Sequence, residues 1–583
     1  MNTVLNPNYP AMAWYAQINP LGEISYLEHG SKVLVKDDFF FEGIFNGELN
    51  PKGLSDSNLC LGSGYNYSEG KPTFITPSHT LEGLFLVKNA EKYFVSNSNV
   101  IAYYLANLTP SHNAVKKGWR IKYGLKQVPQ VIEKSGDIEI TKISFYNFSV
   151  IDYELVLIDK SEEPDFSDFD EYYSYLLKQG MKLMSNYEKL NGKPIDVVST
   201  VSTGFDSVAC LGIAKQLGCK YALTLRSGRG NVKDEGSDIA KAININCKIY
   251  SRPFSEDSLI SRIAIDYLSL DKCSEFVAAG TLAEDVCYLP FEDSINDTLL
   301  LTGFQGDRVW SKTLTPTSYL DRGDVSGSSM GEFRLRTGFI HWPLPFIGCR
   351  KNELLLKITL SDEMKPYTTE SNYNKPISIR IADIAKIPRS LYGVRKKAAS
   401  VLFDETPSAL PVAIYSQQVK YGLRNEIDFE YSPCVDLCAT RNLNYNFNDV
   451  YHSFYAENIP ELIEEIDMLF YSRKIDFFVF ARTIALIHFD ADCGSYYVDA
   501  LGGIIAHISD NNVNPRILDD YQLLKQNILS NLRDFSNSQK QFVHFTYNKE
   551  SETIRSIYDE ELSFENKPND YLSSIWQGKT GVT

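Results

Sequence analysis

The stretch Ser202-Thr203-Gly204-Phe205-Asp206-Ser207 combines small residues, hydroxyl groups and one carboxylate. It follows an apolar run at residues 197–201, and apolar residues at helical spacing follow it. The pattern predicts a strand, a tight loop and a helix, in that order. At a strand end, such a loop turns backbone N–H groups and hydroxyls toward an anion, and the helix adds the positive end of its dipole. The predicted ligand is a phosphate group.

The loop resembles Ser-Gly-Gly-x-Asp-Ser, the pyrophosphate loop of ATP pyrophosphatases, which include asparagine synthetases, β-lactam synthetases and 7-cyano-7-deazaguanine synthases. It lacks the lysine of the nucleoside-triphosphate loop and the glycine spacing of a dinucleotide fingerprint. By resemblance, Asp206 is expected to bind Mg²⁺. Thr203 stands where the family usually has its first glycine. The resemblance implies these ATP-binding residues: Ser202, Thr203, Gly204, Phe205, Asp206 and Ser207. An ordinary turn with Asp206 as a helix N-cap is the alternative.

Alternating strands and helices follow this loop, which favours a parallel sheet covered by helices. Predicted strands cover residues 197–201, 221–225, 247–251 and 298–302, and predicted helices cover residues 172–190, 208–217, 234–243 and 259–270. The expected fold class is α/β, with a doubly wound parallel sheet that the resemblance assigns to the adenine nucleotide alpha hydrolase-like type. Ligands of such sheets bind beyond the carboxyl ends of the strands.

Two further loops with chemical character follow predicted strands. By resemblance, Thr224 and Leu225 lie along the adenine of ATP, and Arg226 reaches its phosphates; a solvated arginine is the alternative. The loop Gly303-Phe304-Gln305-Gly306-Asp307 resembles the Ser-Gly-Glu-Gly-x-Asp-Glu loop of asparagine synthetases. Phe304 replaces the first glutamate of that loop, and Arg308 replaces the last.

Glycines beyond a strand end let the backbone approach a ligand closely, so Gly303 and Gly306 are counted among the ATP-binding residues. Asp307 is expected to act in catalysis and to bind a second Mg²⁺ or a substrate amino group. Its alternative role is a helix N-cap.

A cation-rich segment extends from Tyr373-Asn374-Lys375 to Arg395-Lys396-Lys397. The resemblance implies that a lysine late in the domain contacts the α-phosphate of ATP and the adenylated intermediate. Lys396 and Lys397 are the two candidates for this catalytic role. A basic surface cluster is the alternative.

The chain has 583 residues, a formal net charge of -16 and an isoelectric point near 5.1, which argue against a protein that coats nucleic acid. No signal sequence or bilayer-spanning apolar run stands out, and none of the ten cysteines forms a CxxC pair, so a reducing cytoplasm is expected. No membrane partner is expected.

Three regions are predicted: a β-rich domain at residues 1–165, an ATP pyrophosphatase domain at 166–410 and a helical region at 411–583. The position of the first resembles that of the glutaminase domain of asparagine synthetases. That glutaminase uses an N-terminal cysteine, whereas this chain starts Met1-Asn2-Thr3 and its first cysteine is Cys60. The first domain is therefore interpreted as a degenerate glutaminase-like domain, with an unrelated β domain as the alternative.

Together these motifs predict an AMP-forming, ATP- and Mg²⁺-dependent ligase. It would adenylate a small-molecule carboxylate and transfer the acyl group to ammonia or to an amine on a small molecule or protein. One alternative resembles 7-cyano-7-deazaguanine synthases, with a deazaguanine carboxylate joined to a macromolecule in antiphage defence; those synthases carry a four-cysteine zinc site that the cysteine spacing here does not supply. A protein that binds ATP without turnover is the other alternative.

Overall fold

The computed structural model describes residues 2–90, 92–110, 114, 119–228, 232–252, 270–281, 283–313, 316, 317, 319–322, 324–370, 373–393 and 409–424, with three strands between residues 545 and 563. The chain divides into two compact units, residues 1–258 with 269–429 and residues 259–268 with 430–583. The features described below lie in the first unit, except for those three strands.

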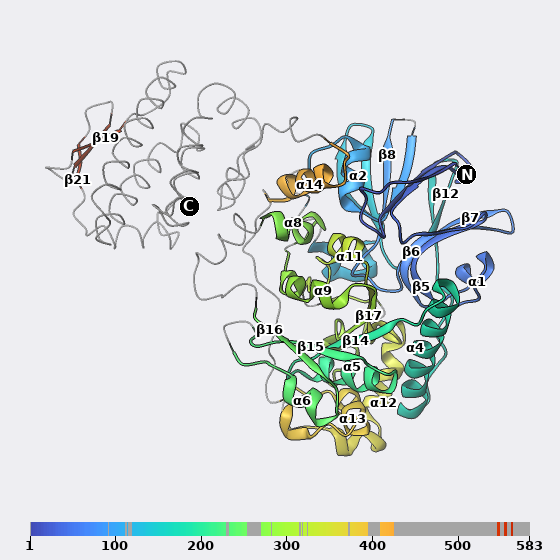
Figure 1. Ribbon diagram of the computed structural model, residues 1–583, viewed down its shortest axis with the longest axis vertical. Coiled ribbons are helices and arrows are strands. Elements are labelled where there is room, and N and C mark those ends of the chain that lie inside the picture. The colour runs from blue at the N-terminus through green and yellow to red at the C-terminus, as the bar shows by residue number, and fades with distance from the viewer. Residues whose placement is uncertain are drawn as a thin grey trace. The chain divides into compact units, whose positions relative to one another are not determined.

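Two sheets form the N-terminal part of the first unit (Figure 1). The seven-stranded sheet runs in the order β1 (Asn2–Leu5), β3 (Ile24–His29), β2 (Trp14–Ile18), β9 (Lys92–Ser96), β8 (Leu84–Asn89), β11 (Ile138–Ile143) and β10 (Gln130–Ser135). The six-stranded sheet runs in the order β13 (Glu154–Ile158), β12 (Asn147–Ile151), β7 (Lys71–Ile75), β6 (Cys60–Ser68), β5 (Phe39–Phe45) and β4 (Leu34–Val35). Trp14, Phe40, Phe74 and Phe148 pack between them and are fully buried.

Helices cover the sheets and lead into the next region. α1 (Pro51–Ser55) lies on β6, and α2 (Asn99–Ala106) packs on β8 and β9. A 3-10 segment, η1 (Trp119–Gln127), precedes β10. After β13, the long helix α4 (Phe169–Asn191) packs against β5 and against the first helix of the following sheet. The N-terminal part is therefore β-rich, as predicted.

A five-stranded parallel sheet follows, in the order β16 (Cys247–Tyr250), β15 (Tyr221–Leu225), β14 (Asp196–Thr200), β17 (Thr298–Thr302) and β18 (Ile340–Pro343). The chain moves outward from β14 to β16 and then crosses to β17 and β18, so the strand order reverses at β14. The expected α/β class is confirmed, as are the four predicted strands. The fifth, β18, was not predicted because its sequence Ile-His-Trp-Pro is short and lacks a clear strand pattern, although all four residues are buried.

Helices connect these strands, and Figure 1 shows α5, α6 and α13 on one side of the sheet and α9 on the other. Helices α5 and α13 pack against each other. The α-helices are α5 (Phe205–Gln216), α6 (Ser237–Ala242), α8 (Leu270–Ala278), α9 (Glu292–Ile295), α10 (Gly306–Val309), α11 (Gly331–Thr337), α12 (Asn352–Leu360), α13 (Pro376–Ile384) and α14 (Ala409–Lys420). The 3-10 helices are η3 (Val286–Phe291), η4 (Leu344–Phe346), η5 (Cys349–Lys351), η6 (Asp362–Tyr367) and η7 (Arg389–Leu391).

The predicted helices at 172–190 and 208–217 correspond to α4 and α5, and the helix predicted at 234–243 is the shorter α6. Nearly all of the helix predicted at 259–270 lies outside the described residues. In the second unit, β19 (Phe545–Asn548), β20 (Thr553–Ser556) and β21 (Glu561–Ser563) form an antiparallel sheet that the sequence did not predict. The helices that the sequence predicts at 462–470, 477–489 and 521–534 lie outside the described residues, and α14, at the start of the predicted helical region, corresponds to none of them.

A buried ion-pair network joins the β-rich part to the α/β part. Arg334 of α11 donates to both carboxylate oxygens of Glu42 on β5, at 2.9 and 3.0 Å, and to Glu82 at 2.6 Å. All three side chains are at least nine-tenths buried. Burial alone would lower the pKa of Arg334, but the two carboxylates raise it well above its ordinary value. The guanidinium therefore stays charged and holds two carboxylates of the N-terminal β-rich part, whose two packed sheets form a sandwich.

Glu332, also on α11, is a second buried link. Its carboxylate accepts hydrogen bonds from Ser98 Oγ at 2.9 Å, from the Asn99 backbone N–H at 2.7 Å and from Tyr421 Oη at 2.8 Å. These donors come from the start of α2 and from just beyond α14. Burial raises the pKa of Glu332 to about 7, although the bonds from Tyr421 and Ser98 act in the opposite direction.

Glu332 is expected to make the unfolding free energy fall as the pH rises from about 4.5 to about 7. In this window the folded state holds a proton on the carboxyl that the unfolded state has already lost, so raising the pH favours unfolding. Glu332→Gln should flatten this dependence by about 3 kcal/mol, measured as the change in the stability difference between variant and wild type from acidic to alkaline pH. The exposed Glu353→Gln is the control. A Glu332→Gln difference independent of pH would contradict the prediction.

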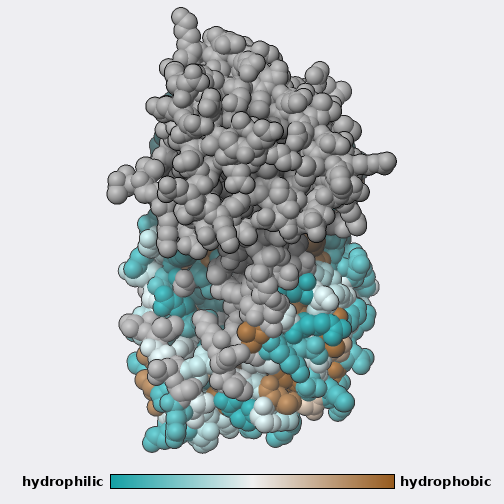
Figure 2. All heavy atoms as spheres, turned by 90° about the vertical axis from the view of Figure 1, so that its left-hand side faces the viewer, coloured by the Kyte–Doolittle hydropathy of each residue, from teal (hydrophilic) through white to brown (hydrophobic). Residues whose placement is uncertain are grey.

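Hydrophilic side chains cover most of the coloured part of the face in Figure 2, and hydrophobic residues form small separate patches there. Among the most exposed large apolar residues, Leu21 lies in the turn between β2 and β3, Met181 on α4 and Leu5 on β1. Such scattered residues are normal on protein surfaces. In the described ranges, no helix has both the length and the apolar character that a bilayer span requires.

Candidate functional site

Asp206, Asp307 and Lys375 meet at the carboxyl ends of two adjacent strands. Asp206 lies in the first turn of α5, after β14, and Asp307 lies in α10, after β17. Lys375 directly precedes α13 and is 1% exposed. Its Nζ donates to Asp206 Oδ2 and, at 2.6 Å, to Asp307 Oδ1. A buried cation thus bridges two carboxylates at the place where the strand order reverses.

The charge on Lys375 follows from its neighbours. Burial alone would lower its pKa, but Asp206 and Asp307 raise it well above its ordinary value, so the ammonium group is retained. Ser378 Oγ, one turn along α13, lies 3.5 Å from Asp206 Oδ1. Two carboxylates and one ammonium leave this cluster with a net negative charge, which suits a divalent cation or a ligand carried by one.

The predicted phosphate loop is a strand-to-helix turn whose hydroxyls contact one another. Ser202 Oγ and Ser207 Oγ lie 3.0 Å apart, and Ser207 Oγ also accepts the Ser202 backbone N–H at 3.0 Å. Gly204 occupies the N-cap of α5; it has no side chain to cap the helix, and its own backbone N–H donates to Ser202 Oγ at 3.2 Å. The alternative role of Asp206 as N-cap is therefore wrong. The positive end of the α5 dipole instead faces a turn lined by two hydroxyls.

Thr203 fits this turn because its backbone N–H, hydroxyl and carbonyl groups all make hydrogen bonds. Its backbone N–H and Oγ1 both donate to Asp234 Oδ1, at 3.0 and 2.5 Å, and its carbonyl accepts from Gly393 N–H at 2.8 Å. Thr203 is not among the residues with positive φ, so a threonine at this position of the turn causes no backbone strain. The threonine ties the loop to two other segments of the chain.

Phe205 fixes the loop from beneath. Its ring is fully buried, with the Tyr373 ring at 4.7 Å and the Tyr392 ring at 5.9 Å between centroids. The Arg389 guanidinium lies 5.0 Å from the ring centroid of Phe205. The side chain of Phe205 thus packs within the protein, and only its backbone remains to serve the predicted phosphate site.

Gly303 and Gly306 bring the second predicted loop against Asp206. A Cβ on Gly303 would lie 2.8 Å from Asp206 Cβ, and one on Gly306 would lie 2.4 Å from Asp206 Cγ. Both glycines are therefore required by contact with the carboxylate that they help to position. Gln305, not Asp307, stands at the N-cap of α10, so the alternative role of Asp307 as N-cap is also wrong.

Gly306→Ala is expected to lower the unfolding free energy by about 1 to 3 kcal/mol, because the added methyl displaces Asp206. Thermal unfolding measures the effect. Gly331→Ala is the matched control, because a Cβ there has no atom within 4 Å. Equal effects of the two substitutions would contradict the prediction.

The predicted adenine-binding residues Thr224 and Leu225 end β15 at the same carboxyl edge of the sheet, and Arg226 follows them. Thr224 and Leu225 are buried, and Thr224 Oγ1 accepts the Gly236 N–H at 2.9 Å. Arg226 is exposed, and its backbone N–H donates to the Tyr250 carbonyl at 3.0 Å. In the described part of the chain, no hydrogen bond or ion pair joins Arg226 to the cluster of Asp206, Asp307 and Lys375.

Lys396 and Lys397 lie outside the described residues, so their predicted catalytic role stays a prediction. The lysine that contacts both aspartates is Lys375, which the sequence placed in the cation-rich segment without assigning it a role. The local signal was available: Lys375 precedes Pro376, and proline favours the first turn of a helix.

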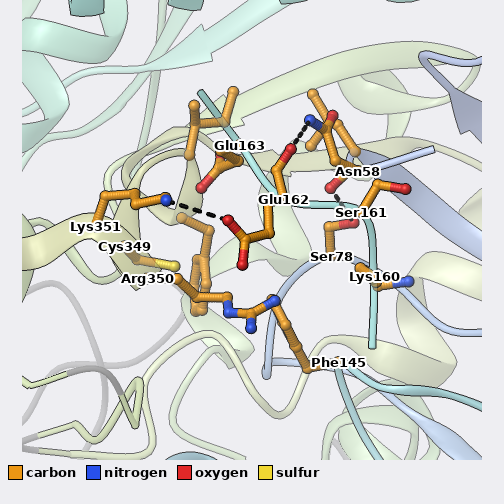
Figure 3. A pocket seen from close by; sticks show the side chains of 13 residues that line it. Asn58, Ser78, Phe145, Lys160, Ser161, Glu162, Glu163, Cys349, Arg350 and Lys351 are labelled. Carbon is orange, nitrogen blue, oxygen red and sulfur yellow. Dashed lines mark hydrogen bonds and ion pairs between the residues drawn. The ribbon is translucent and has the colours of Figure 1, made fainter. Parts of the chain in front are cut away.

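A separate cavity of about 110 Å³ lies between the sandwich and the segment η4–η5 (Figure 3). Its charged side chains contact both charged groups and the backbone: Lys351 Nζ lies 3.5 Å from Glu162, and Lys160 Nζ donates to the Thr76 carbonyl at 2.7 Å. Glu163 accepts the Gly348 N–H at 2.9 Å. None of its lining residues belongs to the cluster around Lys375.

A scan against protein-family models and a search of curated proteins found no match to this chain. Within the described part of the chain, no group of three or more His, Cys, Asp or Glu residues is arranged to hold a metal ion.

Proposed function

We propose that this chain is an AMP-forming ligase that adenylates a carboxylate with ATP and passes the acyl group to an amine or ammonia. The observation that supports it most is the bridge formed by Asp206, Lys375 and Asp307 at the strand-order reversal. Ligands of open α/β sheets bind at such a switch point, beyond the carboxyl ends of the strands. The proposal includes a finer fold assignment. The parallel sheet forms an adenine nucleotide alpha hydrolase-like domain, and the β-rich part before it is a degenerate glutaminase-like domain.

In the proposed complex, the turn from Ser202 to Ser207 binds the pyrophosphate end of ATP. Support comes from the two serine hydroxyls and from the α5 N-terminus, which has no side-chain cap. The adenine then lies toward Thr224 and Leu225, because β15 neighbours β14 in the sheet. These placements put the α-phosphate close to Lys375.

A carboxylate oxygen of the substrate attacks the α-phosphorus, and the bond from that phosphorus to the pyrophosphate oxygen breaks. Negative charge builds on the phosphate oxygens, and Lys375 stabilises it. Asp206 and Asp307 supply the hard oxygen ligands that Mg²⁺ prefers, and their charge exceeds that of Lys375. When bound, Mg²⁺ neutralises phosphate charge.

The test measures AMP and pyrophosphate release from Mg·ATP across a panel of carboxylates, with ammonium or a primary amine present. We expect AMP formation that depends on one carboxylate and disappears in Asp206→Ala. The control is Asp196→Ala, whose carboxylate is half exposed and pairs with Lys220 at the surface. ATP binding without AMP formation for any carboxylate would favour a non-catalytic ATP-binding protein instead.

A further inference from the structure

Gln305 and Asp321 present two buried oxygens without a hydrogen-bond donor beside α10, the helix that carries Asp307: Gln305 is its N-cap, and Asp321 pairs with Arg308. Gln305 is 6% exposed, and its Nε2 donates to the Asp321 backbone carbonyl at 3.1 Å, whereas its Oε1 has no partner. Asp321 Oδ2 pairs with Arg308 Nη2 at 3.3 Å, and its buried Oδ1 has no partner. Each such acceptor costs about 1–3 kcal/mol. The pair therefore indicates a ligand that carries hydrogen-bond donors.

The backbone of Gln305 gives independent support for a functional role. Its φ of 77° lies in the left-handed region, where glycine is the ordinary choice. It stands between Gly303 and Gly306, the two glycines that pack against Asp206. Strained non-glycine residues concentrate at binding and catalytic sites. A buried glutamine in this conformation is held where its side chain contacts the loop of Asp321.

The charges near these acceptors favour a cationic ligand. The carboxylates of Glu284, Asp285, Asp307 and Asp324 all act on the buried guanidinium of Arg322, which contacts the Ser326 carbonyl. With Asp321 and its partner Arg308 added, carboxylates outnumber guanidinium groups in this region. An amine, or its ammonium form, has both the N–H donors and the charge that such surroundings accept.

We propose that Gln305 and Asp321 bind the amine that receives the activated acyl group, an inference that rests on the proposed function. The amine donates N–H groups to Gln305 Oε1 and Asp321 Oδ1. Its nitrogen attacks the acyl carbon, the C–N bond forms, and the C–O bond to AMP breaks with the electron pair leaving on AMP. The proton lost from nitrogen passes to the partly exposed carboxylate of Asp321 and then to solvent.

The test separates the two half-reactions in the full chain. Carboxylate-dependent exchange of labelled pyrophosphate into ATP reports adenylation without an amine, and hydroxamate formation from hydroxylamine reports amine capture. Gln305→Met removes one acceptor at similar volume, and Asp321→Asn removes the charge. Each is expected to raise the KM for hydroxylamine about tenfold while changing pyrophosphate exchange by less than about twofold. Asp362→Asn, which changes an exposed carboxylate that pairs with Lys365 at the surface, is the control.

Two results would overturn the inference: an unchanged hydroxylamine KM in both variants, or loss of exchange together with capture in a variant that melts like the wild type. If Gln305→Met does not fold, Asp321→Asn decides. If none of the carboxylates supports pyrophosphate exchange by the wild-type chain, the proposed function itself is refuted, and the amine site with it. Selective loss of amine capture supports both.

Discussion

Lys375→Met is expected to lower the rate of pyrophosphate release by about 10² to 10³-fold, the range typical for loss of one group that stabilises transition-state charge. Lys375 is buried, charged and in contact with both Asp206 and Asp307. Without it, the phosphate charge that develops during adenylation has lost its closest proposed counter-charge. The measurement is pre-steady-state AMP formation at saturating Mg·ATP.

Loss of stability must be distinguished from loss of catalysis, because removing one partner of a buried ion pair costs about 3–5 kcal/mol. The double variant Asp206→Asn/Lys375→Met removes one carboxylate with the lysine and should regain part of the melting temperature without regaining activity. Lys365→Met is the control, since Lys365 pairs with Asp362 at the surface and is 75% exposed. Wild-type AMP formation by Lys375→Met would refute the assigned role.

Arg334→Met is expected to destabilise the first unit by about 3–5 kcal/mol, because it leaves Glu42 and Glu82 buried without their cation. Burial raises the pKa of Glu42 even with the arginine present, so its charged form already depends on that contact. The melting temperature of the full chain, followed by fluorescence of the buried Trp14 and Trp342, measures the loss in both parts.

The matched control is Arg350→Met, because Arg350 lies 3.6 Å from Asp159, whose side chain is 72% exposed. A surface pair of this kind contributes at most about 1 kcal/mol. Adding Glu42→Gln to Arg334→Met should recover part of the loss, since one buried charge is then removed. Equal melting temperatures for Arg334→Met and Arg350→Met would contradict the prediction.

The Arg334 network also leads toward the candidate site. Glu82, held by Arg334, lies 3.9 Å from Nδ1 of the buried His341 on β18, and His341 Nε2 lies 2.8 Å from Thr302 Oγ1. Thr302 ends β17 and directly precedes Gly303, which packs on Asp206. The sandwich therefore helps to position the strand end that carries Asp307.

The sequence by itself determined the local parts of this protein. Apolar runs ended by small residues predicted β14, β15, β16 and β17, and the turn after β14 was identified from six consecutive residues. These features depend on neighbouring residues, whose periodicity and turn preferences act over a few positions. The hydroxyls and carboxylates at the strand ends were found for the same reason.

Only the tertiary structure decided which side chains meet. Lys375 contacts Asp206 across 169 positions of the chain, and Arg334 contacts Glu42 across 292. No local pattern encodes such pairs, because the sheet's strand order and the packing of α11 and α13 bring them together. The same holds for β18, whose burial makes it a strand, and for the two unpartnered oxygens of Gln305 and Asp321, which become a binding feature only after folding has removed them from water.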